Sequence, residues 1–416
     1  MKAMENRERE IAGQHQGASM KKGWPWKPLG EVCKTGSGGT PLSSRKEFYE
    51  GGNIPWLVSG EVAQGNVREA KNFITKAGLE NSAAKLFPKD TVLVAMYGAT
   101  AGQVGILRFE AATNQAVCGI LPNDKFVPEF LFYFLLAKKD DLVAQATGNA
   151  QPNISQIKIK NTEVPVPPLA EQQRIVGLLD EAFEGLATAK ANAEKNLQNA
   201  CTLFESYLQS VFTKRGPGWV DTALGGVCGF VRGPFGGSLK KSIFVADGYA
   251  VYEQQHAIYD QFDDVRYFID EVKFKEMKRF ELLPDDLIMS CSGTMGRVAI
   301  VPKDIKRGII NQALLKLTPS SKILNTFLKS WMESEAFQDA LKEYSGGAAI
   351  QNVASVKILK EIKVPLPSMS DQKRVVEELD DLHEETQRLA HLYERKLALL
   401  DALKKSLLHQ AFSGEL

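Results

Sequence analysis

The sequence predicts an α+β protein in which two mixed α/β segments alternate with two long helices, and three observations support this fold class. The 416-residue chain is written twice, with a period of about 195 to 200 residues, which is the length of a domain plus a long connector. Each copy begins with short apolar runs separated by glycine and proline. Each copy ends in a proline-free stretch of about 40 residues with helical periodicity. We therefore expect an internal pseudo-twofold repeat.

Short motifs that recur in the same order define this repeat. They pair Leu29–Cys33 with Leu224–Cys228, Phe87–Asp90 with Leu283–Asp286, Asn114–Ala116 with Asn311–Ala313, and Val164–Pro167 with Val364–Pro367. A covalently doubled domain suggests a target that also has two ends.

Each mixed segment is predicted to contain short strands followed by amphipathic helices. The apolar runs Thr91–Met96 and Asp286–Ser290 predict strands, and each leads into a glycine turn. Amphipathic helices are expected within Phe130–Val143 and Phe327–Tyr344. A Val-Pro-x-Pro run then ends each segment, because proline prevents a helix and keeps the preceding residue extended.

Two long helices are predicted after these prolines. Their apolar residues recur mostly at spacings of three and four, as in the seam of a coiled coil. At about 42 residues, each helix would be about 63 Å long and could not bury its seam within a small domain. We expect the two seams to pack as an antiparallel pair that holds the mixed segments apart; two separate oligomerisation stalks are the alternative. The predicted seam positions include Ile175, Leu179, Leu186, Leu197, Phe204, Val375, Leu379, Leu382, Leu389, Leu397, Leu400, Leu403 and Leu407.

These patterns predict five regions along the chain. A polar, disordered leader occupies residues 1–23. The mixed segments occupy 24–168 and 214–368. The long helices occupy 169–213 and 369–416, the second with a C-terminal tail.

Composition and charge exclude several classes of protein. No apolar stretch reaches the ~18 residues of a membrane span, so a cytoplasmic protein without membrane contact is expected. The five cysteines are scattered without a Cys-x-x-Cys pair, which predicts neither a disulfide framework nor a zinc site. The net charge of +1 does not exclude nucleic acid, because binding depends on the local potential.

Catalytic motifs are missing from the sequence. It contains no Gly-x-Ser-x-Gly elbow and no Walker A loop. His383 and His391 lie too far apart along one helix to form a metal pair. Asn53–Trp56 resembles the target-amine motif of amino-methyltransferases, but its first proline is missing, so we interpret it as a buried aromatic on a loop. Neither a catalytic centre nor a bound metal is expected.

Polar side chains on glycine-rich turns are the candidate DNA contacts. Arginine and lysine can neutralise phosphates or read guanine, glutamine can read adenine, and serine and threonine can serve either purpose. Solvated surface residues are the alternative interpretation of each. The candidates are Lys34, Ser37, Thr40, Ser43, Arg45, Lys46, Tyr97, Thr100, Gln103, Arg232, Ser238, Lys240, Lys241, Gln254, Gln255, His256, Ser292, Thr294 and Arg297. Two further polar turns, Thr147–Asn153 and Ser345–Asn352, could approach a DNA backbone closely.

The chain resembles the specificity subunits of type I restriction–modification systems. The resemblance rests on Val164–Val176 and Val364–Val376, which run from Val-Pro-x-Pro into a helix that opens with glutamine and arginine. The C-terminal Ser406–Leu416 resembles the usual tail of this family, and Asn-Gln-Ala occurs in both halves. The resemblance extends from Trp24 to Leu416.

This resemblance implies a division of labour. Each mixed segment would be a target-recognition domain that reads one half of a bipartite sequence in double-stranded DNA. The long helices would set the spacer and dock the methyltransferase (modification) subunits, which would bring S-adenosylmethionine and the active site. A separate motor-nuclease (restriction) subunit would add cleavage, and this chain would bind no cofactor. Because the two halves have diverged in their loops, the implied target is asymmetric.

Two other functions are compatible with parts of the sequence. One is a solitary DNA-modifying enzyme with fused recognition domains, which the missing methyltransferase motifs disfavour. The other is a coiled-coil scaffold that binds no DNA.

Overall fold

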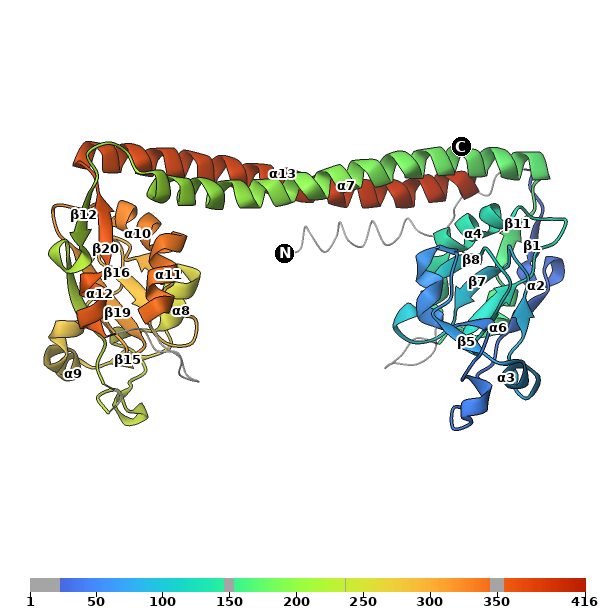
Figure 1. The fold of residues 1–416 in the computed structure, drawn as a ribbon, viewed down its shortest axis with the longest axis horizontal. Coiled ribbons are helices and arrows are strands. Elements are labelled where there is room, and N and C mark those ends of the chain that lie inside the picture. The colour runs from blue at the N-terminus through green and yellow to red at the C-terminus, as the bar shows by residue number, and fades with distance from the viewer. Residues whose placement is uncertain (1–22, 146–152, 236, 345–354) are drawn as a thin grey trace. The chain divides into compact units, whose positions relative to one another are not determined.

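The computed structural model describes residues 23–145, 153–235, 237–344 and 355–416. The predicted leader and the two further polar turns therefore lie outside the described residues, except for Gly23 and Asn153. Contacts divide the chain into two compact units, which are described in turn (Figure 1). The first unit extends to Ala193 and includes Lys396–Leu416, and the second is Glu194–Arg395.

The first unit is built around a five-stranded sheet. Its strand order is β2 (Thr35–Ser37), β10 (Val117–Ile120), β7 (Val92–Ala95), β8 (Val104–Leu107) and β4 (Asn66–Val67). All pairs are antiparallel except β8 with β4. The apolar run in β7 is continuous because both faces of the sheet are covered. Val92 and Val94 belong to one core and Leu93 and Ala95 to another.

A second, four-stranded sheet completes the mixed α/β domain of the first unit. Its order is β5 (Asn72–Ile74), β3 (Ile54–Leu57), β9 (Ala111–Thr113) and β6 (Leu86–Phe87). Helix α3 (Lys76–Glu80) lies at the end of this unit far from α7 (Leu169–Lys214) (Figure 1). The remaining elements are β1 (Trp26–Pro28) paired with β11 (Glu163–Pro165), α2 (Leu29–Val32), α4 (Pro128–Ala137), α5 (Lys139–Ala144), α6 (Gln156–Lys160), and the 3-10 turns η1 (Lys46–Phe48), η2 (Ser59–Gln64) and η3 (Gly98–Thr100).

The second unit repeats this plan. Its central sheet has the order β13 (Cys228–Arg232), β19 (Leu314–Pro319), β16 (Leu287–Ser290) and β17 (Val298–Ile300), which matches β2-β10-β7-β8. The predicted internal repeat is thus confirmed. The other elements are the sheet β15 (Phe268–Ile269), β14 (Tyr249–Tyr252) and β18 (Gly308–Ile310), the pair β12 (Val220–Ala223) and β20 (Lys363–Leu366), the helices α8 (Gln254–Tyr259), α9 (Glu271–Glu276), α10 (Asn325–Glu333), α11 (Glu335–Tyr344) and α12 (Val356–Glu361), and the 3-10 turns η4 (Leu224–Gly226), η5 (Lys241–Ile243) and η6 (Lys278–Phe280).

One predicted motif pairing is wrong by one residue. Phe87–Asp90 and Leu283–Asp286 were aligned end to end, but the two turns are related by Asp90 and Asp285. These residues have φ values of 68° and 69°, a left-handed conformation that aspartate tolerates better than most residues. The alignment of the two repeats at this turn is therefore defined by the backbone conformation and not by similarity of the residue types.

The two long helices pack antiparallel in each unit, as predicted. In the first unit, Ile175 and Leu179 of α7 share a core with Leu408 and Phe412 of α13 (Met369–Ser413). In the second unit, Leu208 and Phe212 of α7 share a core with Val375 and Leu379 of α13. The early part of each helix therefore packs with the late part of the other, which is possible only when the two run in opposite directions.

The predicted seam is correct at the positions named above except at Leu403. Ile175, Leu179, Val375 and Leu379 are buried, and the other predicted seam residues are half-buried apart from Leu403, which is 46% exposed. Leu208, Phe212 and Leu408, which the prediction did not include, are also buried. The residues that face the core near the helix ends step by four, because a helix of 3.6 residues per turn drifts from a strict 3.5-residue repeat.

A buried glutamine fixes the start of each long helix. Gln172 is fully buried; its Oε1 accepts from Val127 N–H at 2.8 Å, and its Nε2 donates to the Lys125 and Pro167 carbonyls at 2.8 and 2.9 Å. Gln372 repeats these bonds with the Leu324 N–H and the carbonyls of Lys322 and Pro367 at 2.8, 3.0 and 3.1 Å. The repeated glutamine therefore joins the start of each helix to the mixed α/β domain that precedes it in the chain.

Among the described helices, none is both long enough and apolar enough to cross a membrane.

Candidate nucleic-acid interface

Three turns meet at one edge of the central sheet in the first unit. They are the segment after β2 (Ser37–Thr40), the segment after β7 (Tyr97–Gln103) and the β9–β10 turn (Asn114–Ala116), and we call them the first turn cluster. The Gly39 N–H donates to the Thr113 carbonyl at 2.9 Å, and the Met96 N–H donates to the Ala116 carbonyl at 2.8 Å. Backbone bonds thus hold the three turns together independently of their exposed side chains.

The same three turns meet in the second unit. This second turn cluster consists of Arg232–Phe235 after β13, Ser292–Arg297 after β16, and Asn311–Ala313. The Gly233 N–H donates to the Leu314 carbonyl and the Cys291 N–H to the Ala313 carbonyl, both at 2.9 Å. The Cys291 bond matches the Met96 bond of the first unit, and the Gly233 bond matches the bond from the Gly38 N–H to the Val117 carbonyl at 3.4 Å, so the two clusters are built by equivalent backbone bonds.

The repeated Asn-Gln-Ala motif has a structural part and an exposed part. Asn114 Oδ1 accepts from Ala116 N–H at 3.1 Å, and Asn311 Oδ1 accepts from Ala313 N–H at 2.9 Å. Each asparagine thus folds its own turn, as asparagine commonly does. Gln115 and Gln312, in the middle of the motif, are exposed at the surface of the cluster.

Two glycines shape the long turn of each cluster. Gly98 and Gly102 have φ values of 72° and 79°, and Gly293 and Gly296 have values of 63° and 75°. Such values favour glycine. A Cβ at Gly102 would lie 2.7 Å from Val143 Cγ2 of α5, so this turn can approach the helix only because the side chain is absent.

The side chains at equivalent positions of the two clusters differ. Ser37 pairs across the sheet with Cys118, whereas Arg232 at the matching place pairs with Leu315. Gln103 and Arg297 each follow the second glycine of the turn. The two units therefore present different hydrogen-bonding groups on the same backbone framework.

The stretches that contain the turns after β2 and β13 carry positive charge and no negative charge. Residues 34–46 contain three basic residues and no acidic residue, and so do residues 232–245. In the second cluster, burial raises the pKa of the Cys291 thiol to about 12, and the adjacent Arg232 guanidinium acts in the opposite direction. Because Glu47 and Glu50 lie 3.7 and 3.8 Å from Arg45 and Lys46, the local excess of cations is clearest in the second stretch, where it favours a polyanionic ligand.

The structure brings nine of the predicted contact residues into the two clusters: Ser37, Thr40, Tyr97, Thr100, Gln103, Arg232, Ser292, Thr294 and Arg297. Ser238, Lys240 and Lys241 follow the second cluster along the chain and are exposed. Arg45 and Lys46 lie at η1 beside α3, at 3.7 Å from Glu47 and 3.8 Å from Glu50 respectively. Lys34 precedes β2 and Ser43 precedes η1, and both are exposed.

The prediction that His256 contacts DNA is wrong for this conformation. His256 lies in α8 and is fully buried. Its Nδ1 accepts from the Glu253 N–H at 2.9 Å, and its Nε2 donates to the Asp264 carbonyl at 3.1 Å. Both ring nitrogens are therefore used within the domain. Gln254 and Gln255 are half-buried beside it.

Trp56 supports the first cluster from beneath. It lies on strand β3 and not on a loop, which corrects the interpretation of Asn53–Trp56, but it is buried as expected. Its Nε1 donates to the Gly39 carbonyl at 3.0 Å, and its ring packs edge-on against Tyr49. The tetrapeptide therefore has a structural role in holding the turn after β2.

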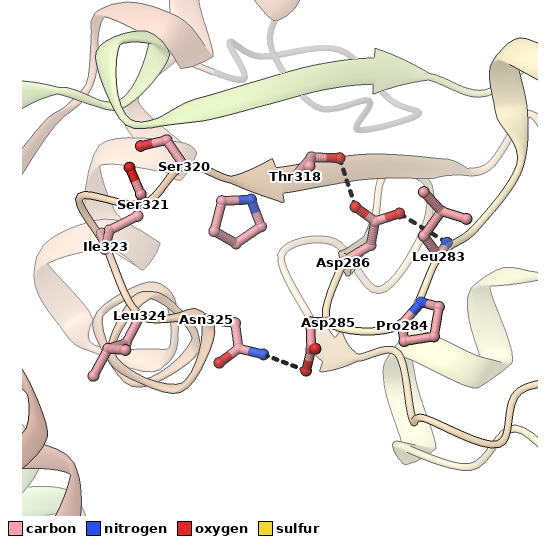
Figure 2. Close-up of a pocket in the computed structure, with 11 residues that line it drawn as sticks. Leu283, Pro284, Asp285, Asp286, Thr318, Ser320, Ser321, Ile323, Leu324 and Asn325 are labelled. Carbon is pink, nitrogen blue, oxygen red and sulfur yellow. Dashed lines mark hydrogen bonds between the residues drawn. The ribbon is translucent and has the colours of Figure 1, made fainter.

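A hollow in the second unit is lined by polar groups that bond one another (Figure 2). Asp286 accepts from the Thr318 hydroxyl at 2.5 Å and from the Leu283 N–H at 2.9 Å. Asp285 accepts from Asn325 Nδ2 at 3.1 Å. These bonds hold the turn before β16, so the hollow has no evident ligand role.

Within the described residues, no group of three or more potential metal ligands is present.

Sequence reasoning missed Gln115, Gln312 and Phe235 as surface groups of the clusters. The glutamines could have been found because Asn-Gln-Ala recurs while only its asparagine is needed for the turn. Phe235 could have been found because it follows Gly-Pro and precedes Gly-Gly in a basic stretch, where an apolar side chain has little chance of burial.

Known proteins share this architecture. A family model described as the type I restriction modification DNA specificity domain matches residues 21–197 and again 218–394. The EcoR124I/EcoR124II specificity subunit of Escherichia coli is 29% identical over 161 residues, which are 38% of this chain and 40% of that protein. The EcoBI specificity subunit of E. coli is 25% identical over 332 residues, covering 74% of this chain and 69% of that protein.

Solved structures agree in fold. The HsdS subunit from Thermoanaerobacter tengcongensis has a TM-score of 0.66 at 20% identity, with 95% of this chain and 98% of that chain covered. A chain from a study of complex assembly and conformational transition of the type I R-M system has a TM-score of 0.75 at 21% identity, covering 95% and 99%. Since the family model matches both halves, the chain belongs to the type I restriction–modification DNA specificity family and carries its specificity domain twice.

Proposed function

We propose that this chain is the sequence-recognition subunit of a type I restriction–modification complex, and that each turn cluster reads one half of a bipartite, asymmetric DNA target. One observation carries the proposal: the same backbone framework occurs twice, with different polar side chains at equivalent surface positions. Two identical clusters would favour a palindromic target. Ser37 against Arg232, and Gln103 against Arg297, favour two different half-sites.

The chemistry of these side chains suits the grooves of DNA. An arginine such as Arg297 can donate two hydrogen bonds to guanine, and a glutamine such as Gln103 can pair with adenine. The acid-free stretches around them can approach phosphates without repulsion.

The long helices suit the roles of spacer and docking surface. Two modules that read one face of B-DNA need half-sites about 34 Å apart, and helices of 46 and 45 residues reach nearly 70 Å. Beyond the seam, Leu203, Leu392, Leu399 and Leu403 are exposed on these helices. Exposed apolar side chains of this kind are a suitable surface for modification subunits.

Catalysis is assigned to the partners. Modification subunits would hold S-adenosylmethionine and methylate the target, and a motor-nuclease subunit would cleave DNA in the cytoplasm. The names of the relatives, which are specificity subunits, support this division. This chain would then contribute recognition alone and bind no cofactor.

Methylome sequencing of a host that carries this chain and its modification subunit tests the proposal. We expect one methylated motif with two unlike halves and a fixed spacer. Methylation by the chain alone would support a solitary enzyme, and the absence of any sequence preference with every partner would support a scaffold.

Replacing Arg297 by alanine tests the assignment of half-sites. Loss of a bidentate base contact should cost about 1–3 kcal/mol and relax the preference at one base pair. The half-site read by the first unit should not change. Arg279→Ala, an exposed arginine in η6 of the same unit, is the control and should leave the motif intact. An unchanged motif in both variants would remove Arg297 from the base contacts.

A further inference from the structure

Phe235 is the most exposed of the large apolar side chains among the described residues. Its side chain is 88% accessible at the surface of the second turn cluster. Single exposed apolar residues are common on soluble proteins, so exposure alone decides nothing. The position and surroundings of this phenylalanine are therefore the relevant evidence.

The backbone before Phe235 is firmly held. Gly233 and Pro234 are buried, and the Gly233 N–H donates to the Leu314 carbonyl at 2.9 Å. A Cβ at Gly233 would lie 1.8 Å from the Asn311 carbonyl oxygen, so the chain passes directly against the Asn-Gln-Ala turn. The Phe235 carbonyl then accepts from the Ser238 N–H at 2.9 Å. An exposed ring thus extends from a fixed base, which lowers the entropy lost when a ligand binds it.

The groups around this ring match DNA better than protein or lipid. Arg232 precedes it, Lys240 and Lys241 follow it, and residues 232–245 contain no acidic residue. The exposed Arg297 and Gln312 belong to the same cluster. Cationic groups can hold the phosphates while an aromatic ring contacts the faces of bases.

We propose that Phe235 inserts its ring into a base step of the half-site read by the second unit. Apolar side chains that enter a base step partly unstack it and bend the duplex. The inference rests on the proposed function, because it takes duplex DNA as the ligand of the second turn cluster. It adds a residue that reads the deformability of the target, beside the polar residues that read base edges.

The first unit lacks this wedge. Its strand register places Thr40 at the position that matches Phe235, three residues after the Ser37 that matches Arg232. The Thr40 hydroxyl donates instead to Gln115 Oε1. The ring therefore has no counterpart at the matching position of the first unit.

The test uses the complex of the full chain with its modification subunits, and duplexes that carry its methylated motif. The adenine analogue 2-aminopurine, placed at successive positions of each half-site, fluoresces more strongly where stacking is broken. Besides the base that a modification subunit extrudes for methylation, we expect the wild type to brighten one further position in the second half-site and none in the first. Phe235→Ala should abolish that signal and weaken binding about tenfold, the usual effect of losing one aromatic stack. Phe235→Trp should stay within about threefold of the wild type, since it keeps an aromatic face.

Val272→Ala is the matched control, because Val272 is 69% exposed on α9 of the same unit. It should bind and fluoresce like the wild type. The dependence of binding on salt should be the same in all variants, since no phosphate contact is lost.

Three results would overturn the wedge: wild-type behaviour of Phe235→Ala, a smaller salt dependence in that variant, or loss of a modification subunit from the complex without a direct effect on DNA binding. A wild-type complex without any sequence preference would contradict the proposed function itself, so the two failures can be distinguished.

Discussion

At the scale of single residues, the repeated glutamine shows why one polar side chain can be worth more than an apolar one. Gln172 is fully buried and bonds to one backbone N–H and two backbone carbonyls around it. A leucine of similar volume would leave all three groups without partners. Buried unsatisfied groups cost more than the bonds themselves contribute.

Gln172→Leu should therefore destabilise the first unit by about 2 to 4 kcal/mol. Gln173→Leu is the matched control, because Gln173 is the exposed neighbour on the same helix and should change stability by less than about 0.5 kcal/mol. Urea unfolding followed by circular dichroism measures both. Equal urea midpoints for the two variants would contradict a stabilising role of the Gln172 hydrogen bonds.

Thiol reactivity gives a second test at this scale. Burial raises the pKa of Cys118, Cys228 and Cys291 to about 12 from the ordinary 9.0, whereas Cys201 is exposed. Cys33 is also buried, and its pKa is raised for the same reason. At pH 8.5 the native chain should take up one iodoacetamide, at Cys201, and Cys201→Ser should take up none. Mass spectrometry after brief labelling decides this, and rapid labelling of any other native cysteine contradicts it.

The same shifts fix the sign of a pH effect. Because the folded pKa values lie above the unfolded ones, the three thiols contribute stability that is fully present below pH 9 and is lost as the pH rises toward 12. Stability should therefore fall in alkaline solution more steeply for the wild type than for a chain with alanine at Cys118, Cys228 and Cys291.

At the scale of elements, the ends of the long helices belong to the cores of the recognition domains. Phe412 of α13 packs edge-on against Phe130 and Phe134 of α4, with ring centroids 5.3 and 5.4 Å apart. Phe212 of α7 packs in the same way against Phe327 of α10. The last turns of each long helix therefore form part of the core of a recognition domain.

Phe412→Ala should destabilise the first unit by about 3–5 kcal/mol, the usual cost of removing a buried ring. Leu403→Ala on the same helix should have little effect, since Leu403 is 46% exposed. Thermal unfolding of the two variants provides the comparison. If the Leu403 variant were as unstable as the Phe412 variant, Leu403 would have to be counted among the buried seam residues.

Elements with regular periodicity could be predicted from sequence, and irregular ones could not. The long helices were predicted because their seams repeat over many turns, where one misplaced leucine such as Leu403 does not hide the period. The glycine turns were predicted because Gly98 and Gly293 punctuate apolar runs. His256 was misjudged because a polar residue looks the same in sequence whether it faces solvent or bonds its own backbone. Phe235 was missed because hydropathy predicts burial for phenylalanine everywhere.

At the scale of the whole molecule, the proposed spacer role links helix length to DNA sequence. Inserting four residues into α7 between the exposed Glu194 and Lys195 adds about one turn, or about 6 Å. We expect the tolerated spacer to lengthen by one or two base pairs while both half-sites stay the same. Methylome sequencing measures this.

Two control variants complete that experiment. Replacing Glu194 and Lys195 by alanine without a change of length should leave the spacer unaltered. A changed half-site with an unchanged spacer in the insertion variant would contradict the proposal that the long helices set the spacer length.

The buried glutamines have a consequence for how this family can evolve. Gln172 and Gln372 bond only to backbone groups, so the joint between helix and domain does not depend on which side chains the domain carries. A recognition domain from another chain could be attached at the same joint if it presents the same backbone there. New specificities could then arise by recombination at the joint, without any readjustment of the parts that the exchange leaves in place.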